Sequence, residues 1–183
     1  MKLNRSEILR YMRMGRATPD AELSKRIDKV EAELLKVARP KEVHKLIKVK
    51  DLPFESADLN HVLGDAEECY LFAATLGHEV DLLIRRYSIT SPADLLILQA
   101  SAATMIEAYI DECELELKKG VGVGVGCREL CTRFSPGYGD LPLSVQPKFL
   151  ETVDAGKQLG ISLTDAYLMI PSKSVTAIIG VKK

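Results

Sequence analysis

The sequence has few of the residues that build common catalytic and metal-binding sites. Among 183 residues there is no tryptophan, and there are only three histidines and four cysteines. The histidines are isolated from one another, and the spacing of Cys127 and Cys131 is not one that zinc sites use. We therefore expect no metal site and no catalytic residues. We interpret Cys69, Cys113 and the other two thiols as reduced, buried side chains.

Strong charge and long apolar runs are also missing. The formal net charge is −1, so we expect no nucleic-acid partner. No apolar run looks long enough to span a bilayer, and residues 1–7 carry charge but no apolar region of a signal peptide. We expect a cytoplasmic protein without a membrane partner. Hydrophobic residues make up 46% of the chain, which is enough for one domain with a core.

The glycine-rich run from Gly120 to Gly126 does not match a phosphate-binding loop. Val125 and Cys127 stand where the nucleotide-binding patterns need glycine, and the run follows a predicted helix rather than a strand. Three interpretations stay open. The run is a flexible loop, an edge strand leading towards Arg133, or a place where the backbone lies close to a ligand or partner.

Hydrophobic periodicity predicts helices over residues 4–14, 19–38, 57–63, 78–87, 92–118 and 144–155. The second helix carries an apolar stripe from Leu23 to Val37, which suits packing on the domain or docking to a partner. Strands are predicted over residues 42–49 and 69–75. Residues 166–170 and 174–180 are predicted to form a hairpin joined by Pro171-Ser172-Lys173.

Helices and strands are mixed without regular β-α-β alternation. This order favours an α+β fold with a mainly antiparallel central sheet and flanking helices. We expect a single domain over residues 1–183, with a helical N-terminal extension (1–40) and a core (41–183).

The segment from Arg133 to Tyr138 has the composition of a ligand-binding strand. Arg133 offers a planar fork that fits a carboxylate. Pro136 biases Ser135 towards an extended conformation, and Gly137 lets a ligand approach the main chain. Tyr138 adds an aromatic face with a polar tip. The segment suits a small zwitterionic ligand. Taken singly, the alternatives are a surface salt bridge for Arg133 and core packing for Tyr138.

Arg133-x-x-x-Gly137-Tyr138, followed by Ile161 to Met169 and Pro171 to Val175, resembles the activation domain of cobalamin-dependent methionine synthase. The resemblance covers about residues 67 to 180, and we find none of the synthase's homocysteine, folate and cobalamin modules in the sequence. It implies a free-standing activation domain: a curved α+β molecule with a central antiparallel sheet. Two ligand contacts of the family, an N-terminal Asp and a later Tyr-Tyr pair, have no assigned counterpart.

The resemblance also implies a function. The family's domain binds S-adenosylmethionine, covers the corrin and supports reductive methylation of inactive cob(II)alamin, with an electron from a flavodoxin-like donor. The cobalamin is held by the partner, here a methionine synthase lacking its own activation domain. The protein positions the reactants, while the cofactor and the sulfonium carry the chemistry.

Residue roles follow from the motif. Arg133 is expected to pair with the ligand carboxylate, and the main chain of Phe134 and Ser135 to contact the adenosyl part. Gly137 is expected to give clearance for the ligand, and Tyr138 to flank the sulfonium or the path of the methyl group.

Glu107 is assigned to a corrin-facing position, because Glu107-Ala108-Tyr109 is similar to a Glu-Ala-aromatic run of the family. Glu107, Asp111 and Glu114 recur at steps of four and three on one helix face, so a solvated acidic face is the alternative. At the level of function, the alternative is a non-catalytic corrinoid-protein interaction or chaperone module that no longer binds S-adenosylmethionine. An independent methyltransferase is less favoured, since neither a catalytic base nor a Gly-rich methyltransferase loop is found.

Overall fold

The structure, a computed structural model, describes residues 3–15, 18–119 and 129–182, so the glycine-rich run and Cys127 lie outside the described residues. The helices are α1 (Arg5–Tyr11), α2 (Ala21–Val37), α3 (Ala57–Leu63), α4 (His78–Thr90), α5 (Pro92–Lys119), α6 (Gln146–Thr152) and α7 (Ala155–Leu159). Short 3₁₀ turns are η1 (Val49–Asp51) and η2 (Leu143–Val145). The strands are β1 (Lys41–Lys48), β2 (Glu68–Thr75), β3 (Ser162–Leu163), β4 (Met169–Ile170) and β5 (Ser174–Val181).

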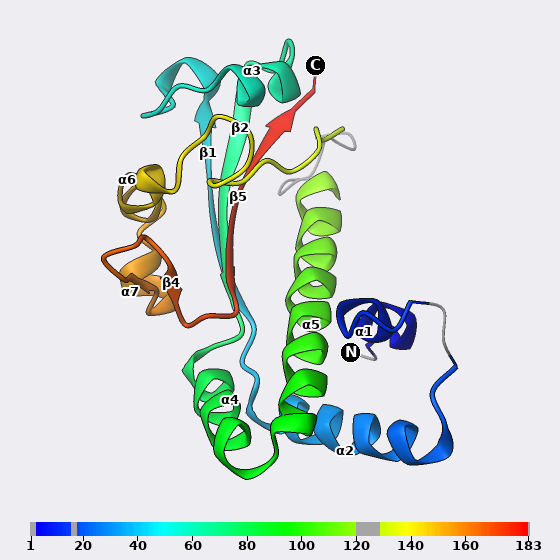
Figure 1. The fold of residues 1–183 in the computed structure, drawn as a ribbon. Helices are drawn as coiled ribbons and strands as arrows, with labels where there is room; N and C mark the ends of the chain where they lie inside the picture. Colours follow the sequence, from blue (N-terminus) through cyan, green and yellow to red (C-terminus); the bar gives the residue numbers. More distant parts are fainter. Residues whose placement is uncertain (1–2, 16–17, 120–128, 183) are drawn as a thin grey trace.

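The main sheet is antiparallel and has the strand order β1-β2-β5 (Figure 1). In its register, Phe72 in the middle strand lies opposite His44 of β1 and Ala177 of β5. The short strands β3 and β4 form a separate antiparallel pair. The fold is therefore α+β with an antiparallel sheet flanked by helices, as the sequence predicts.

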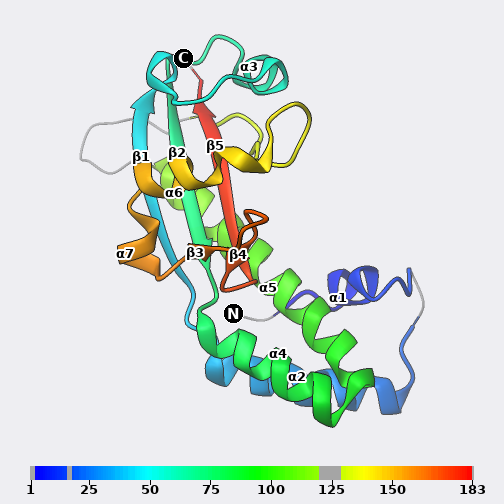
Figure 2. The ribbon, with the colours of Figure 1, turned by 60° about the vertical axis from the view of Figure 1, so that its left-hand side comes forward.

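Strand β2 explains why the sheet is covered on both faces. Its side chains are almost all buried, and they alternate between two hydrophobic clusters. Tyr70, Phe72 and Ala74 pack with α1, α2, α4 and α5, whereas Leu71 and Ala73 pack with α3, α6 and α7. In Figure 2 the three strands lie side by side, with α6 and α7 on the near face and α5 behind.

Helix α5 is the longest helix on the face of the sheet that α1, α2 and α4 also cover. By length and composition alone it could cross a membrane, which corrects the expectation that no apolar run is long enough. However, half of its apolar window is buried inside the molecule, and it packs against α1, α2, α4 and β2. The core helix of a soluble protein has the same length and composition, so this feature is weak evidence for a membrane.

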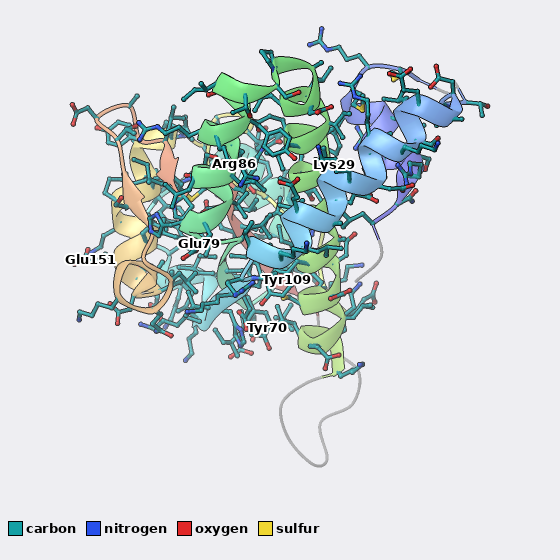
Figure 3. All side chains as sticks on the ribbon, turned by 90° about the horizontal axis from the view of Figure 1, so that it is seen from below. Lys29, Tyr70, Glu79, Arg86, Tyr109 and Glu151 are labelled. Atoms are coloured by element: carbon teal, nitrogen blue, oxygen red, sulfur yellow. The ribbon has the colours of Figure 1, made fainter. Side chains whose placement is uncertain are left out.

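The apolar stripe of α2 packs on the domain, with Ile27, Val30 and Leu34 fully buried. Its opposite side is charged, and an ion pair between Glu33 and Arg86 joins α2 to α4. Figure 3 shows α2 and α4 next to each other, with Arg86 on α4. Of the two interpretations of the stripe, packing on the domain is therefore the one that the structure shows.

Two predictions in the C-terminal third are wrong. Residues 166–170 and 174–180 do not pair as a hairpin: β4 pairs with β3, and β5 pairs with β2. Residues 171–173 therefore carry the chain from one sheet into the other. The helix predicted over 144–155 is replaced by η2, α6 and α7. Asp154 adopts a left-handed conformation (φ 55°), which separates α6 from α7.

Candidate functional site

The motif segment runs along the free edge of β5. Phe134 N–H donates to the Ile178 carbonyl at 3.0 Å, and Ile178 N–H donates back to the Phe134 carbonyl at 2.7 Å. Nearer the end of β5, Cys131 N–H donates to the Gly180 carbonyl at 2.8 Å. The predicted extended conformation is therefore present up to Phe134, and the main chain of Phe134 is already hydrogen-bonded within the protein.

After Phe134 the chain leaves the edge in a tight turn. Gly137 has φ +94° and donates its N–H to the Leu141 carbonyl at 2.7 Å, while Tyr138 N–H donates to the Ser135 carbonyl at 3.2 Å. A Cβ on Gly137 would lie 3.1 Å from Leu143 Cδ2. Glycine is required at this position for the positive φ and for room beside Leu143.

Asp140 fastens this turn to the start of α3. Its carboxylate accepts hydrogen bonds from the Ser56 hydroxyl, from Ala57 N–H at 2.7 Å and from Asp58 N–H at 3.3 Å. In return, Asp140 N–H donates to Asp58 Oδ2 at 3.1 Å. The Ser56 hydroxyl, followed by the Ala57 N–H, holds the pKa of Asp140 below its ordinary value. Sequence reasoning missed this anchor, whose only local signal is an Asp directly after the glycines.

Arg133 lies against the acidic face of α5. Its guanidinium contacts Asp111 Oδ1 at 3.0 Å, Glu107 Oε2 at 3.4 Å and Glu114 Oε1 at 3.6 Å. Its Nη1 is buried and has no hydrogen-bond partner among the described residues. One positive formal charge thus meets three negative ones, which leaves this cluster with a net negative charge. Helical spacing placed the three acids on one face, and a salt bridge was the alternative role for Arg133. The structure contains such ion pairs, but the sequence did not identify these acids as the partners.

The motif residues line a groove of about 540 Å³, which we call the motif groove. Its apolar walls come from α5, the motif segment, η2, β4 and β5, and comprise Ile110, Phe134, Pro136, Leu143, Met169 and Val175. Its polar lining comprises Glu107, Thr132, Arg133, Ser135, Tyr138, Gln146, Ser174 and Thr176. Tyr138 is 68% exposed, so it is not a core residue. Of the predicted site residues, only Gly137 does not line the groove. A side chain at Gly137 would meet Leu143, which does line the groove.

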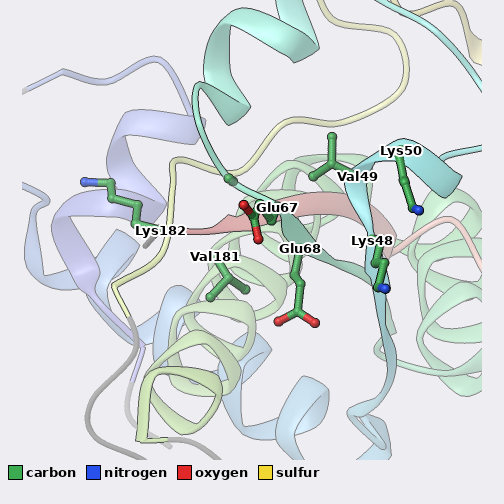
Figure 4. Close-up of a pocket in the computed structure, with 8 residues that line it drawn as sticks. Lys48, Val49, Lys50, Glu67, Glu68, Val181 and Lys182 are labelled. Atoms are coloured by element: carbon green, nitrogen blue, oxygen red, sulfur yellow. The ribbon is translucent and has the colours of Figure 1, made fainter.

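A second and larger cavity, of about 690 Å³, lies where β1 ends and β2 begins. In Figure 4 the carboxylates of Glu67 and Glu68 lie between Lys48 on one side and Lys182 on the other. Lys182 also pairs with Glu129 at 2.5 Å. This cavity mixes charges of both signs and contains no motif residue. The motif groove is the better candidate, because ligand sites combine apolar walls with a few convergent polar groups.

The thiols in the described part of the chain are shielded. Cys69 is buried, as predicted, and burial raises the pKa of its thiol to about 11. Cys113 and Cys131 are only half-buried, which corrects the expectation that they are buried, and this partial burial still raises the pKa of each thiol. Within residues 3–15, 18–119 and 129–182, no three His, Cys, Asp or Glu side chains converge on a position that could hold a metal ion.

Comparison with known proteins adds one finding about the fold. No protein-family model matches the chain, and no curated protein matches it in sequence. Among solved structures, the chain is similar to the crystal structure of the MetH reactivation domain bound to AdoHcy, with a TM-score of 0.65. The likeness covers 98% of this chain and 70% of that chain at 16% sequence identity. The chain therefore has the fold of that reactivation domain.

Proposed function

We propose that this protein binds S-adenosylmethionine and acts in trans, in the cytoplasm, as the reactivation module of a cobalamin-dependent methionine synthase. The observation that carries the proposal is the motif groove, which gathers Arg133, Ser135 and Tyr138 between apolar walls at the edge of β5. The proposal is supported by the shared fold, because the similar MetH reactivation domain was crystallised with AdoHcy.

The charges around Arg133 suit S-adenosylmethionine. This ligand carries a sulfonium, an ammonium and one carboxylate, so it brings a net positive charge to a cluster that is net negative. The Arg133 fork can take the carboxylate, while the α5 acids take the ammonium. Because Nη2 and Nε of the guanidinium already contact three carboxylates, a ligand carboxylate must displace one of them or reach the buried, unpartnered Nη1.

The rest of the groove accounts for the neutral part of the ligand. The apolar walls can hold the adenosyl group, and the exposed ring of Tyr138 can flank the sulfonium. The main chain of Ser135 is the nearer candidate for adenosyl contact, since Phe134 N–H is occupied by Ile178. When bound, the ligand would supply a methyl group to the partner's corrinoid after a flavodoxin-like donor had reduced it by one electron, and S-adenosylhomocysteine would remain in the groove. Glu107 lines the groove with a side chain that is 46% exposed, so a corrin on the partner could face it.

A second candidate function is a corrinoid-protein interaction module that no longer binds S-adenosylmethionine. The observation that favours it is the engagement of Arg133 by Glu107, Asp111 and Glu114. If these ion pairs hold against the ligand, the fold keeps its partner and loses the methyl donor.

Calorimetry with S-adenosylmethionine separates the two candidates. We expect binding by the wild-type protein, and a loss of about 10- to 150-fold in Arg133→Ala, since a hydrogen bond to a charged group contributes about 1.5–3 kcal/mol. Arg133→Lys is the matched control, which keeps the charge and loses the fork.

The functional test mixes the protein with a synthase that lacks this domain, S-adenosylmethionine and a reductant. Ligand binding without any recovery of synthase activity would reject the in-trans role. Association with a cobalamin-binding domain without ligand heat would establish the second candidate.

A further inference from the structure

The motif groove has a second polar end, on the α6 side of β5, which the motif does not include. Gln146, the first residue of α6, is only 3% exposed, and Thr176 of β5 is 2% exposed. The Thr176 hydroxyl donates to Gln146 Oε1 at 3.1 Å. Both residues line the groove, and within the described ranges the Gln146 amide N–H groups donate to no protein acceptor.

The main chain of Thr176 is available in the same place. Ile178 exchanges both of its main-chain hydrogen bonds with Phe134, so even-numbered residues of β5 point their N–H and C=O towards the free edge. Thr176 has the same orientation, but the motif segment has left the edge by then. Its N–H and C=O therefore face the groove and have no backbone partner among the residues that the structure describes.

The two ends of the groove lie on opposite faces of the sheet. Val175 belongs to the cluster that packs with α5, where Arg133 meets its acids, whereas Ile178, on the same face as Thr176, belongs to the cluster that contains α6. A ligand in the groove thus passes around the edge of β5. One end of it meets charges and the other meets neutral donors and one acceptor.

We infer that the Gln146 amide and the main chain of Thr176 form a subsite for the uncharged, heteroaromatic end of the ligand. The inference rests on the proposed function and names the residues that select its purine. The subsite offers N–H donors from both residues and one acceptor, the Thr176 carbonyl. This set matches a ring that carries an acceptor nitrogen next to an amino group, as adenine does. Leu143 and Met169 supply apolar contact to the ring.

The alternative is that Gln146 is only a satisfied core residue. Its carbonyl accepts from Thr176, whereas its amide N–H groups have no acceptor among the described residues. The amide nitrogen is not one of the buried atoms that lack a partner, so it keeps contact with solvent and is open to a ligand in the groove. A purely structural role predicts a change in stability and no change in ligand selectivity. The two readings therefore differ in what they predict for ligands that contain only one end of S-adenosylmethionine.

The test titrates the full chain with S-adenosylmethionine and with 5′-methylthioadenosine, which has the purine end but no amino-acid end. We expect Gln146→Met to weaken both ligands by the same factor, about 3- to 10-fold, as for the loss of a neutral hydrogen bond. Arg133→Ala is the matched comparison, and it should weaken S-adenosylmethionine while leaving 5′-methylthioadenosine within about twofold. Unchanged affinity of folded Gln146→Met for both ligands would overturn the inference.

A measurement on the wild-type protein keeps the test independent of folding. We expect 5′-methylthioinosine, which lacks the amino donor, to bind more weakly than 5′-methylthioadenosine. Equal affinity would remove the Thr176 carbonyl from the subsite and overturn the inference. If the wild-type protein binds neither S-adenosylmethionine nor 5′-methylthioadenosine, the proposed function fails together with the subsite. If it binds both and Gln146→Met changes neither, only the subsite fails.

Discussion

The two ends of the motif groove differ in how many of their polar groups already have a partner within the protein. At the charged end, Arg133 already has three carboxylate partners at 3.0 to 3.6 Å. At the neutral end, Gln146 and the Thr176 main chain offer groups without a partner in the described part of the protein. A ligand exchanges contacts at the first end and adds contacts at the second. The motif alone therefore says little about affinity, because its arginine gains less from a carboxylate than an unpaired arginine would.

The two ends also depend on different supports. The charged end depends on the strand that carries Arg133 along β5, where Cys131 packs beside Gly180. The neutral end depends on α6, which is held in the second hydrophobic cluster by Phe149. Substitutions in each support should disturb one end and spare the other.

The largest effect is expected from Phe149→Ala. Phe149 is fully buried and stacks on Phe54, with ring centroids 6.1 Å apart. Truncation leaves a cavity under α6 and should lower the free energy of unfolding by about 3–5 kcal/mol. Urea denaturation measures this change. Tyr138→Ala, which removes a 68% exposed ring, is the control and should change stability little. A loss below about 1 kcal/mol in Phe149→Ala would mean that α6 is not held by this ring.

Much of the fold could be predicted from local pattern. The predicted limits of α3, β2 and α5 agree with the structure to within one residue, because their apolar runs and end signals are strong. The C-terminal hairpin was wrong for a non-local reason. Thr75 pairs with Ser174, almost a hundred residues away, and no local signal distinguishes that partner from a neighbouring strand.

The part of the site that is contiguous in sequence could be predicted, and the part assembled from distant segments could not. The segment from Arg133 to Tyr138 was found because its residue types lie together in the sequence. Asp140, Gln146 and the acids around Arg133 act through residues that are distant along the chain, such as Ser56 and Thr176. Only the folded sheet edge brings these groups together. Sequence patterns therefore selected Glu107 and grouped the three acids on one helix face, but gave no reason to select Asp140 or Gln146 or to pair the acids with Arg133.

A smaller effect, at the charged end, is expected from Gly180→Ala. A Cβ at this position would lie 2.8 Å from Cys131 Sγ and 2.9 Å from Leu63 Cδ2. The motif strand must then shift, at a cost of about 1–3 kcal/mol in unfolding free energy. S-adenosylmethionine should lose more affinity than 5′-methylthioadenosine, since only the former uses Arg133. Gly156→Ala, where the nearest atom is 3.6 Å away, is the matched control. Equal losses for both ligands would show that the two ends are not independently supported.

Asp140→Asn tests the anchor of the Tyr138 turn through pH. The pKa of Asp140 is lowered in the folded protein, so its ionised form stabilises the fold above the unfolded value of about 3.8. This contribution is lost as the pH falls through the lower, folded pKa. We expect the variant to melt about 2–4 °C below the wild type at neutral pH. The difference should shrink as the pH falls below 3.8 and vanish only below the lower, folded pKa. Asp165→Asn, on an exposed turn, is the control. A difference that persists in acid would exclude the carboxylate as its cause.

The smallest effect, and the most specific to the charged end, is expected from Glu107→Gln. Glu107 is partly exposed and contacts Arg133 at 3.4 Å, so its electrostatic contribution is modest. We expect S-adenosylmethionine to bind about 1.5- to 5-fold more weakly, as for an exposed ion pair. AdoHcy should change less, because it has no sulfonium and a neutral net charge. Calorimetry with both ligands at low and high salt measures the difference, which should shrink as salt screens the charges.

The control is Glu112→Gln, which removes a charge from the same helix outside the groove. It corrects for any general effect of the lost charge on α5. Equal weakening of S-adenosylmethionine and AdoHcy by Glu107→Gln would mean that Glu107 acts only by holding Arg133 in place. A gain in affinity for both ligands would show instead that the ion pair competes with the ligand carboxylate. The charged end would then restrain binding, and the neutral end would supply most of the affinity.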